Sequence, residues 1–132
     1  MKNVVLDSYA IITFLEQEKG HEIVSSIFDE CIAHDQRAAI CVVNWGEVYY
    51  MVLREAGEKG ATLALDTMRA LPLEIVDVNQ ELTLQAGKFK AHHKMSYAEA
   101  FAAALAKARK AELVTGDKEI KTVEHSIRVR WI

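Results

Sequence analysis

The sequence predicts an α/β fold, a three-layer α/β/α sandwich around a mainly parallel five-stranded sheet. Two observations support this prediction. Five short apolar segments alternate with longer segments that have helical spacing, and repeated strand–helix–strand order gives a parallel sheet with helices on both faces. The chain has 132 residues, 51% of them hydrophobic, and no repeat or linker divides it. We therefore expect one domain over residues 1–132.

Four of the apolar segments are predicted to be strands covered on both faces, because they show little polar alternation. They are residues 4–6, 39–43, 73–76 and 113–115. The fifth segment, residues 127–131, alternates apolar residues with arginine. This alternation predicts an edge strand with one solvated face.

The connections contain apolar residues at helical spacing, for example Ile23, Ile27 and Cys31, and then Leu82 and Ala86. Each of the first three connections is long enough for two helices. Residues 97–106 are rich in alanine on every side of the expected helix. Small side chains let a helix lie close to a sheet, so we predict that this helix is the most buried.

Charge is distributed unevenly along the chain. The net charge of −3 argues against a protein that binds nucleic acid mainly by electrostatics. However, residues 1–87 contain 6 basic and 14 acidic side chains, and residues 88–132 contain 10 basic and 5 acidic side chains. The basic part has enough lysine and arginine for phosphate contacts, although ordinary solvated helix faces also explain many of them.

Two further features concern the compartment. Asp7 interrupts the first residues before a signal-peptide core can form, and no apolar stretch is long enough for a membrane span. We therefore expect a cytoplasmic protein without a membrane partner. Cys31 and Cys41 have apolar neighbours, which predicts buried, reduced thiols.

Acidic residues occur where a parallel sheet places its functional site, outside the carboxyl ends of the strands. Asp7 follows the first strand, Glu47 lies shortly after the second, and Asp117 follows the fourth. Glu99 lies in the first turn of the alanine-rich helix. The topology therefore predicts that these acids meet at one edge of the sheet.

Each acid also has a structural interpretation. Asp7 or Ser8 fits a helix cap, and Asp117 fits a turn before a short helix. The segments 44–47 and 96–99 both fit a capping box, in which a cap residue and a glutamate three positions later satisfy exposed amides. For any one acid alone, capping is the more common role.

Considered together, the acids favour a metal site. Burying several carboxylates is costly unless a cation neutralises them, and Mg²⁺ or Mn²⁺ prefers oxygen ligands. Such ions are usually held by a few carboxylates together with substrate phosphate. The chemistry that this arrangement suits is metal-assisted hydrolysis of a phosphodiester.

The sequence resembles the PIN-domain family at four places: residues 4–8, Glu47, residues 96–100 and residues 114–117. The chain length and the order of these places are most similar to VapC-type toxins. The resemblance implies a sheet ordered 3-2-1-4-5 and a metal-dependent endoribonuclease. It implies that four acids bind one or two Mg²⁺ or Mn²⁺ ions: Asp7, Glu47, Glu99 and Asp117.

The resemblance also suggests supporting residues and partners. Ser8 and Thr115 would support the acids by hydrogen bonds. Glu119 is the nearest candidate for a further family acid, or else an exposed residue of a first helical turn. Glu99 stands where the family most often has aspartate. VapC-like proteins cleave RNA and are typically homodimers that a cognate antitoxin holds inactive.

Two other functions remain possible on the sequence. A receiver-like phosphoryl-transfer domain also places aspartates at strand ends, and Asp77 would then be the acceptor. A catalytically inactive PIN-like interaction module is the second. Trp45, Tyr49 and Tyr50 form an aromatic group that is predicted to be core. If exposed, they would suit a dimer or antitoxin interface.

Overall fold

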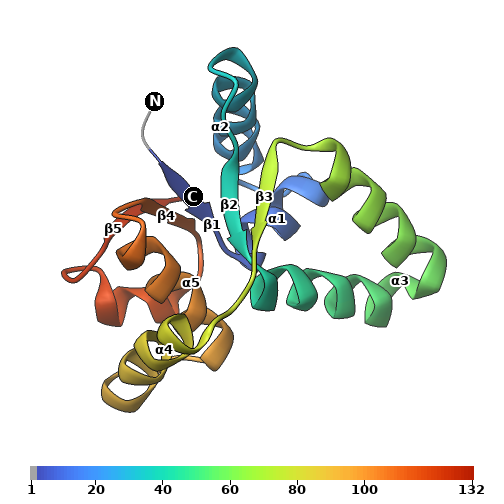
Figure 1. Ribbon diagram of the computed structural model, residues 1–132. Helices are drawn as coiled ribbons and strands as arrows, with labels where there is room; N and C mark the ends of the chain where they lie inside the picture. The colour runs from blue at the N-terminus through green and yellow to red at the C-terminus, as the bar shows by residue number, and fades with distance from the viewer. Residues whose placement is uncertain (1–2) are drawn as a thin grey trace.

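A computed structural model describes residues 3–132 and contains one five-stranded sheet (Figure 1). All neighbouring strands are parallel, and their order is β3-β2-β1-β4-β5. The strands are β1 (Val4–Leu6), β2 (Ala38–Cys41), β3 (Leu73–Val76), β4 (Glu112–Thr115) and β5 (Arg128–Trp131). The predicted fold class and strand order are therefore confirmed.

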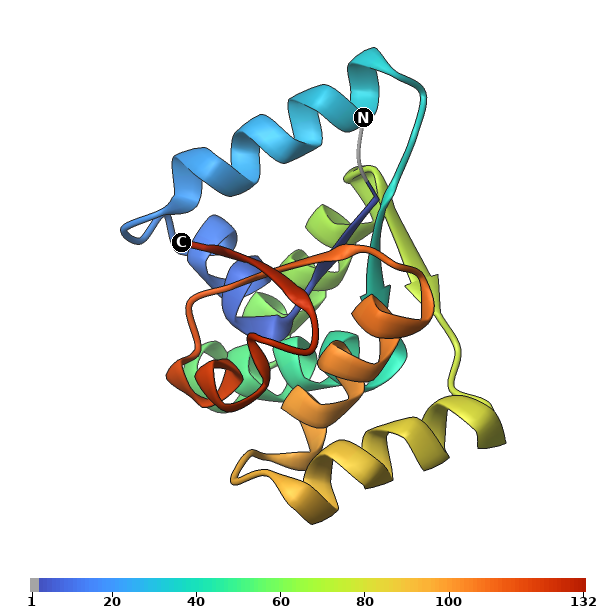
Figure 2. The same cartoon turned by 90° about the vertical axis from the view of Figure 1, so that its left-hand side faces the viewer.

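Helices cover both faces of this sheet. They are α1 (Ser8–Leu15), α2 (His21–Ala33), α3 (Val42–Ala70), α4 (Gln80–His92), α5 (Tyr97–Ala108) and the 3₁₀ helix η1 (Lys118–Val123). Because side chains alternate along a strand, Val4 and Leu6 pack with α1, α2 and α3, whereas Val5 packs with α4 and α5. Figure 2 shows α2 and the α4–α5 pair on opposite sides of the sheet.

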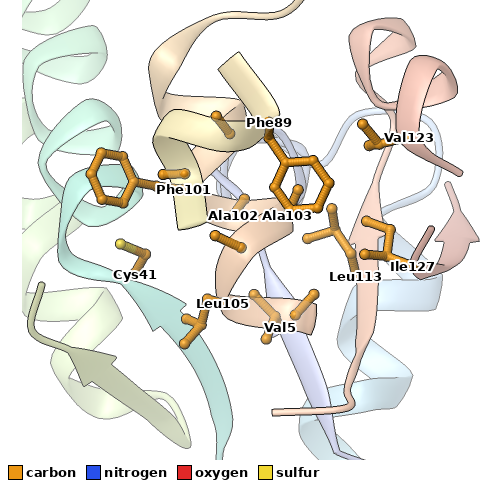
Figure 3. Close-up of a cluster of buried hydrophobic side chains, with 14 of the residues drawn as sticks. Val5, Cys41, Phe89, Phe101, Ala102, Ala103, Leu105, Leu113, Val123 and Ile127 are labelled. Carbon is orange, nitrogen blue, oxygen red and sulfur yellow. The ribbon is translucent and has the colours of Figure 1, made fainter. Parts of the chain in front are cut away.

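Helix α5 lies at the centre of one core, as its alanines predict. Every residue from Glu99 to Ala106 is buried. Figure 3 shows Ala102 and Ala103 among the side chains of Val5, Leu113 and Phe89. The small side chains let the helix lie close to β1 and β4, and this fixes the position of its first turn.

Two strand predictions need correction. Val42 and Val43 do not extend β2 but form the start of α3, with Cys41 as the N-cap. Local β propensity is weak enough for the tertiary fold to override it. Strand β3 is not covered on both faces, because it forms an edge of the sheet and its Ile75 is exposed. The edge position predicted for β5 is confirmed.

The aromatic group on α3 is only partly core. Trp45 packs against the core that α1 and α2 form, but Tyr49 and Tyr50 are exposed. The core prediction is therefore wrong for the two tyrosines. Figure 1 shows the reason: α3 runs away from the sheet and then folds back. Its kink is at Gly57, whose φ of 71° is a left-handed conformation that glycine adopts easily.

The two cysteines are buried and free, as predicted. Burial raises the pKa of both thiols above the ordinary value. Among residues 3–132, no helix combines the length and the apolar character that a membrane span requires.

The cap of α4 provides a test of the fold away from the acids. Asn79 Oδ1 accepts a hydrogen bond from Leu82 N at 2.8 Å. We expect Asn79→Ala to lower the free energy of unfolding by about 1 kcal/mol, because one N–H at the helix start loses its partner. Asn79→Asp keeps the acceptor and should remain close to wild type in urea denaturation. Equal stability of both variants and the wild type would contradict this role of the cap.

Candidate functional site

The structure gathers the predicted acids at the carboxyl edge of the sheet. Glu47, Glu99 and Asp117 line a pocket of about 360 Å³. Asp7 is fully buried beside it, and its pKa responds to Glu99 and Asp117. The three acids therefore come from α3, α5 and the turn after β4, and the fourth from the end of β1.

Asp7 is both a helix cap and a member of this cluster. Its Oδ1 accepts a hydrogen bond from Ala10 N at 2.9 Å, which caps α1. Its Oδ2 accepts one from the Thr115 hydroxyl. Burial raises the pKa of Asp7 to about 6, although the hydrogen bonds from Thr115 and Ala10 oppose the shift. The capping and site interpretations of Asp7 are thus compatible.

Glu47 is held by side chains rather than by a helix end. The Ser8 hydroxyl donates to Glu47 Oε1, and Tyr50 Oη donates to Oε2 at 3.4 Å. The capping box predicted for residues 44–47 is not formed, because Asn44 already lies inside α3. Asn44 instead donates from Nδ2 to the carbonyl of Ala98 at 3.0 Å, which ties α3 to the first turn of α5.

Asp117 is fixed by the same threonine that holds Asp7. Thr115 Oγ1 donates to Asp7 and accepts from Asp117 N at 2.9 Å. Asp117 Oδ1 then accepts from Glu119 N at 2.9 Å, so that it caps η1 as the turn interpretation predicts. The Thr115 hydroxyl therefore couples the acids that follow β1 and β4.

Glu99 lacks these compensating contacts. Its side chain is almost fully buried, and Oε2 has no hydrogen-bond partner. Burial, followed by the charges of Asp7 and Asp117, raises the pKa of Glu99 to about 10. Without a cation, Glu99 therefore holds its proton more tightly than an ordinary glutamate does.

Glu119 lies outside the pocket. It is exposed on η1, as the alternative interpretation of this residue predicts, and its Oε1 accepts from Ser96 N at 3.0 Å. Ser96 in turn caps α5, because its Oγ accepts from Glu99 N at 3.2 Å. Ser8 and Thr115 thus contact pocket acids through their side chains, whereas Glu119 contacts the backbone at the start of α5.

The donor set fits a hard divalent cation. All four acids supply oxygen, and the unpartnered Glu99 Oε2 is a buried acceptor beside other carboxylates. Among residues 3–132, no three such side chains are already close enough together to hold an ion. A buried oxygen without a partner and a raised pKa are features that a bound cation would compensate.

Several pocket residues were not predicted from the sequence. Tyr9, Met51 and Glu18 also line the pocket. The Tyr9 ring lies directly on Gly116, where a Cβ would be only 2.2 Å from Tyr9 Cε1. Tyr9 directly follows Asp7 and Ser8 in the sequence, so its place in the pocket could have been predicted from its position. Glu18 has no such signal, because it reaches the pocket only through the turn after α1.

Some of the basic residues in the C-terminal part are engaged in structural contacts. Arg109 forms a bidentate ion pair with Glu74, at 2.6 and 2.9 Å, and Arg130 pairs with Glu112 at 2.7 Å. Other members of this part are exposed. Lys118 and Lys121 lie on η1, directly after Asp117. These two lysines are therefore close in sequence to Asp117, which lines the pocket.

Comparisons with known proteins agree with the fold. The family model of the PIN domain matches residues 4–126. The chain superposes on DNA-bound VapBC from Salmonella typhimurium with a TM-score of 0.77 and 17% identity, covering 98% of both chains. VapBC2 from Rickettsia felis, bound to a promoter DNA fragment, superposes with a TM-score of 0.75 and 18% identity. The match covers 96% of both chains.

A third similar structure is described as a toxin. Mycobacterium tuberculosis VapC20, described as a toxin that cleaves the sarcin–ricin loop, gives a TM-score of 0.68 with 13% identity. The match covers 90% of this chain and 93% of that chain. No curated protein sequence matches the chain significantly. At these identities the structural matches show a shared fold.

Proposed function

The chain belongs to the PIN-domain family, and from this premise we propose that it is a Mg²⁺- or Mn²⁺-dependent endoribonuclease, the toxin of a toxin–antitoxin pair. The observation that supports the proposal most strongly is the buried, unpartnered Glu99 Oε2 among other carboxylates. A buried acid without a partner is costly, and a site that binds a cation accounts for that cost.

In this proposal the chain supplies the ligands and their orientation. Asp7, Glu47, Glu99 and Asp117 would hold the ion. The chemistry that the ion would supply is activation of water and stabilisation of negative charge on phosphate oxygens. The Thr115 hydroxyl keeps Asp7 oriented, and the Ser8 hydroxyl does the same for Glu47. Such outer hydrogen bonds fix the geometry of metal ligands.

The proposed substrate is RNA. The similar structure VapC20 is described as a toxin that cleaves the sarcin–ricin loop. Lys118 and Lys121 are exposed on η1, the short helix that follows Asp117, and in this proposal they contact backbone phosphates. Tyr9 and Met51 form the less polar part of the pocket lining. Sequence preference would then come from bases displayed in single strands or loops.

The proposed partner is a cognate antitoxin, because several of the similar structures are toxin–antitoxin complexes. A cleft of about 700 Å³ between α1–α2 and the two arms of α3 offers such a partner an apolar surface, which includes Phe14, Leu15 and Leu63. We also propose a homodimer, with the exposed Tyr49 and Tyr50 as candidate interface residues, and action in the cytoplasm.

The growth of a bacterium that expresses the chain tests toxicity and partner together. We expect growth arrest when the chain is expressed alone, rescue by coexpression of the adjacent reading frame, and no arrest with Asp7→Asn. The readout is colony formation after induction. Normal growth with the soluble wild-type chain would contradict the toxin proposal.

Two alternatives are less well supported. The receiver-like domain is excluded by the family match and by the strand order, since receiver domains have the order 2-1-3-4-5. Asp77, its required acceptor, lines a different pocket from the acids. The inactive module predicts neither Mn²⁺ affinity nor cleavage. The four carboxylates at the sheet edge argue against it.

A further inference from the structure

The cap at the start of α5 has an unusual composition. Ser96 and Glu99 have the spacing of a capping box, in which the glutamate returns to the backbone N–H of the cap residue. Only one half of the box is formed, where Ser96 Oγ accepts from Glu99 N. Ser96 N donates instead to Glu119 Oε1, 23 residues away in the sequence, at 3.0 Å. Glu119 therefore occupies the position that Glu99 takes in a complete box.

This exchange leaves Glu99 in an unfavourable place. Its side chain is 3% exposed, and its Oε2 has no hydrogen-bond partner. The charges of Asp7, Asp117 and Glu47 act on it. A turn of the Glu99 side chain toward Ser96 N would provide the hydrogen bond that its Oε2 lacks. Such a turn would take the Glu99 carboxyl group out of the acid cluster.

We infer that Glu119 is a positioning residue, which keeps Glu99 in the acid pocket by occupying the Ser96 N–H. Glu119 is well placed for this role, because its own backbone N donates to Asp117 Oδ1 at 2.9 Å. Asp117 thus fixes Glu119, and Glu119 in turn positions Glu99. The inference rests on the proposed function only for the assumption that the pocket binds a divalent cation.

Mn²⁺ titration of the full chain by calorimetry tests the inference. Glu119→Ala frees the Ser96 N–H, so we expect Mn²⁺ affinity to fall roughly tenfold, as for other outer-shell changes. Glu119→Gln removes the charge but keeps an acceptor oxygen, and should restore affinity to near the wild-type value. Glu124→Ala removes an exposed glutamate of the same region and is the matched control. Wild-type affinity in Glu119→Ala, or failure of glutamine to restore it, would overturn the inference.

A crystal structure of metal-free Glu119→Ala gives a second, metal-independent readout. We expect the Glu99 carboxylate to lie about 3 Å from Ser96 N, a normal hydrogen-bond distance. A Glu99 side chain that stays in the pocket would overturn the inference. If the wild-type chain neither bound Mn²⁺ nor cleaved RNA, the proposed function would fail, whereas this structure would still decide the role of Glu119.

Discussion

Asp7→Asn is expected to abolish metal-dependent RNA cleavage while the fold is retained. We expect the loss to exceed the roughly tenfold to hundredfold that removal of an outer-shell partner costs. Asparagine removes the charge that a cation requires, but its side-chain oxygen can still accept from Ala10 N. Because asparagine caps helices as well as aspartate does, α1 should be preserved. The measurement is the rate of cleavage of labelled RNA in Mn²⁺, with circular dichroism to check the fold.

Asp77→Asn is the matched control for this experiment. Asp77 also follows a strand, β3, but it is exposed and lines a different pocket from Glu99 and Asp117. The same chemical change there should leave the cleavage rate at the wild-type value. A folded Asp7→Asn protein that cleaves RNA at the wild-type rate would contradict the assignment of the acids as a metal site.

Glu99→Gln is expected to flatten the pH dependence of stability in the metal-free protein. The folded state raises the pKa of Glu99 from 4.5 to about 10, through burial and then the neighbouring charges. Between these values the folded state holds a proton that the unfolded state has lost. Stability therefore falls as pH rises through this window, by up to about 1.4 kcal/mol per pH unit. Asp7, whose pKa is raised to about 6, adds a second loss in the more acidic range.

Glutamine cannot ionise, so the variant should lose the Glu99 part of this slope and become the more stable protein at alkaline pH. Urea denaturation in EDTA at several pH values measures the effect. Glu124→Gln changes an exposed glutamate outside the pocket and should keep the wild-type pH dependence. An unchanged slope in Glu99→Gln would show that Glu99 is not the group that the fold forces to remain protonated. Mn²⁺ should reverse the alkaline loss in the wild type, because a cation favours the ionised acids.

The predictable part of the fold is the part that depends on long local patterns. The predictions of strand β1 and helix α5 are correct. An apolar run fits a strand covered on both faces, and an alanine-rich helix fits close packing against a sheet. The end of β2 was misplaced, because Val42 and Val43 look alike in a strand and in a first helical turn. Burial of Tyr49 and Tyr50 was overestimated, because the sequence does not show that α3 leaves the sheet.

The positions of the candidate acids near strand ends could be predicted from the sequence. Their hydrogen-bond partners could not. The hydrogen bond from Ser96 N to Glu119 depends on how η1 packs against α5, which no local pattern encodes. Similarly, counting basic residues could not show that Arg109 is committed to Glu74. A capping role and a position in the acid cluster are compatible at Asp7, because a strand end and a helix start meet there.

The most direct test of the metal-dependent ribonuclease proposal is cleavage of total bacterial RNA by the purified chain. The protein is incubated with RNA in EDTA, and then with Mn²⁺ or Mg²⁺ added in excess. We expect intact RNA in EDTA and discrete cleavage products once either ion is added. Cleavage that proceeds equally in EDTA, or intact RNA in both ions with folded protein, would contradict it.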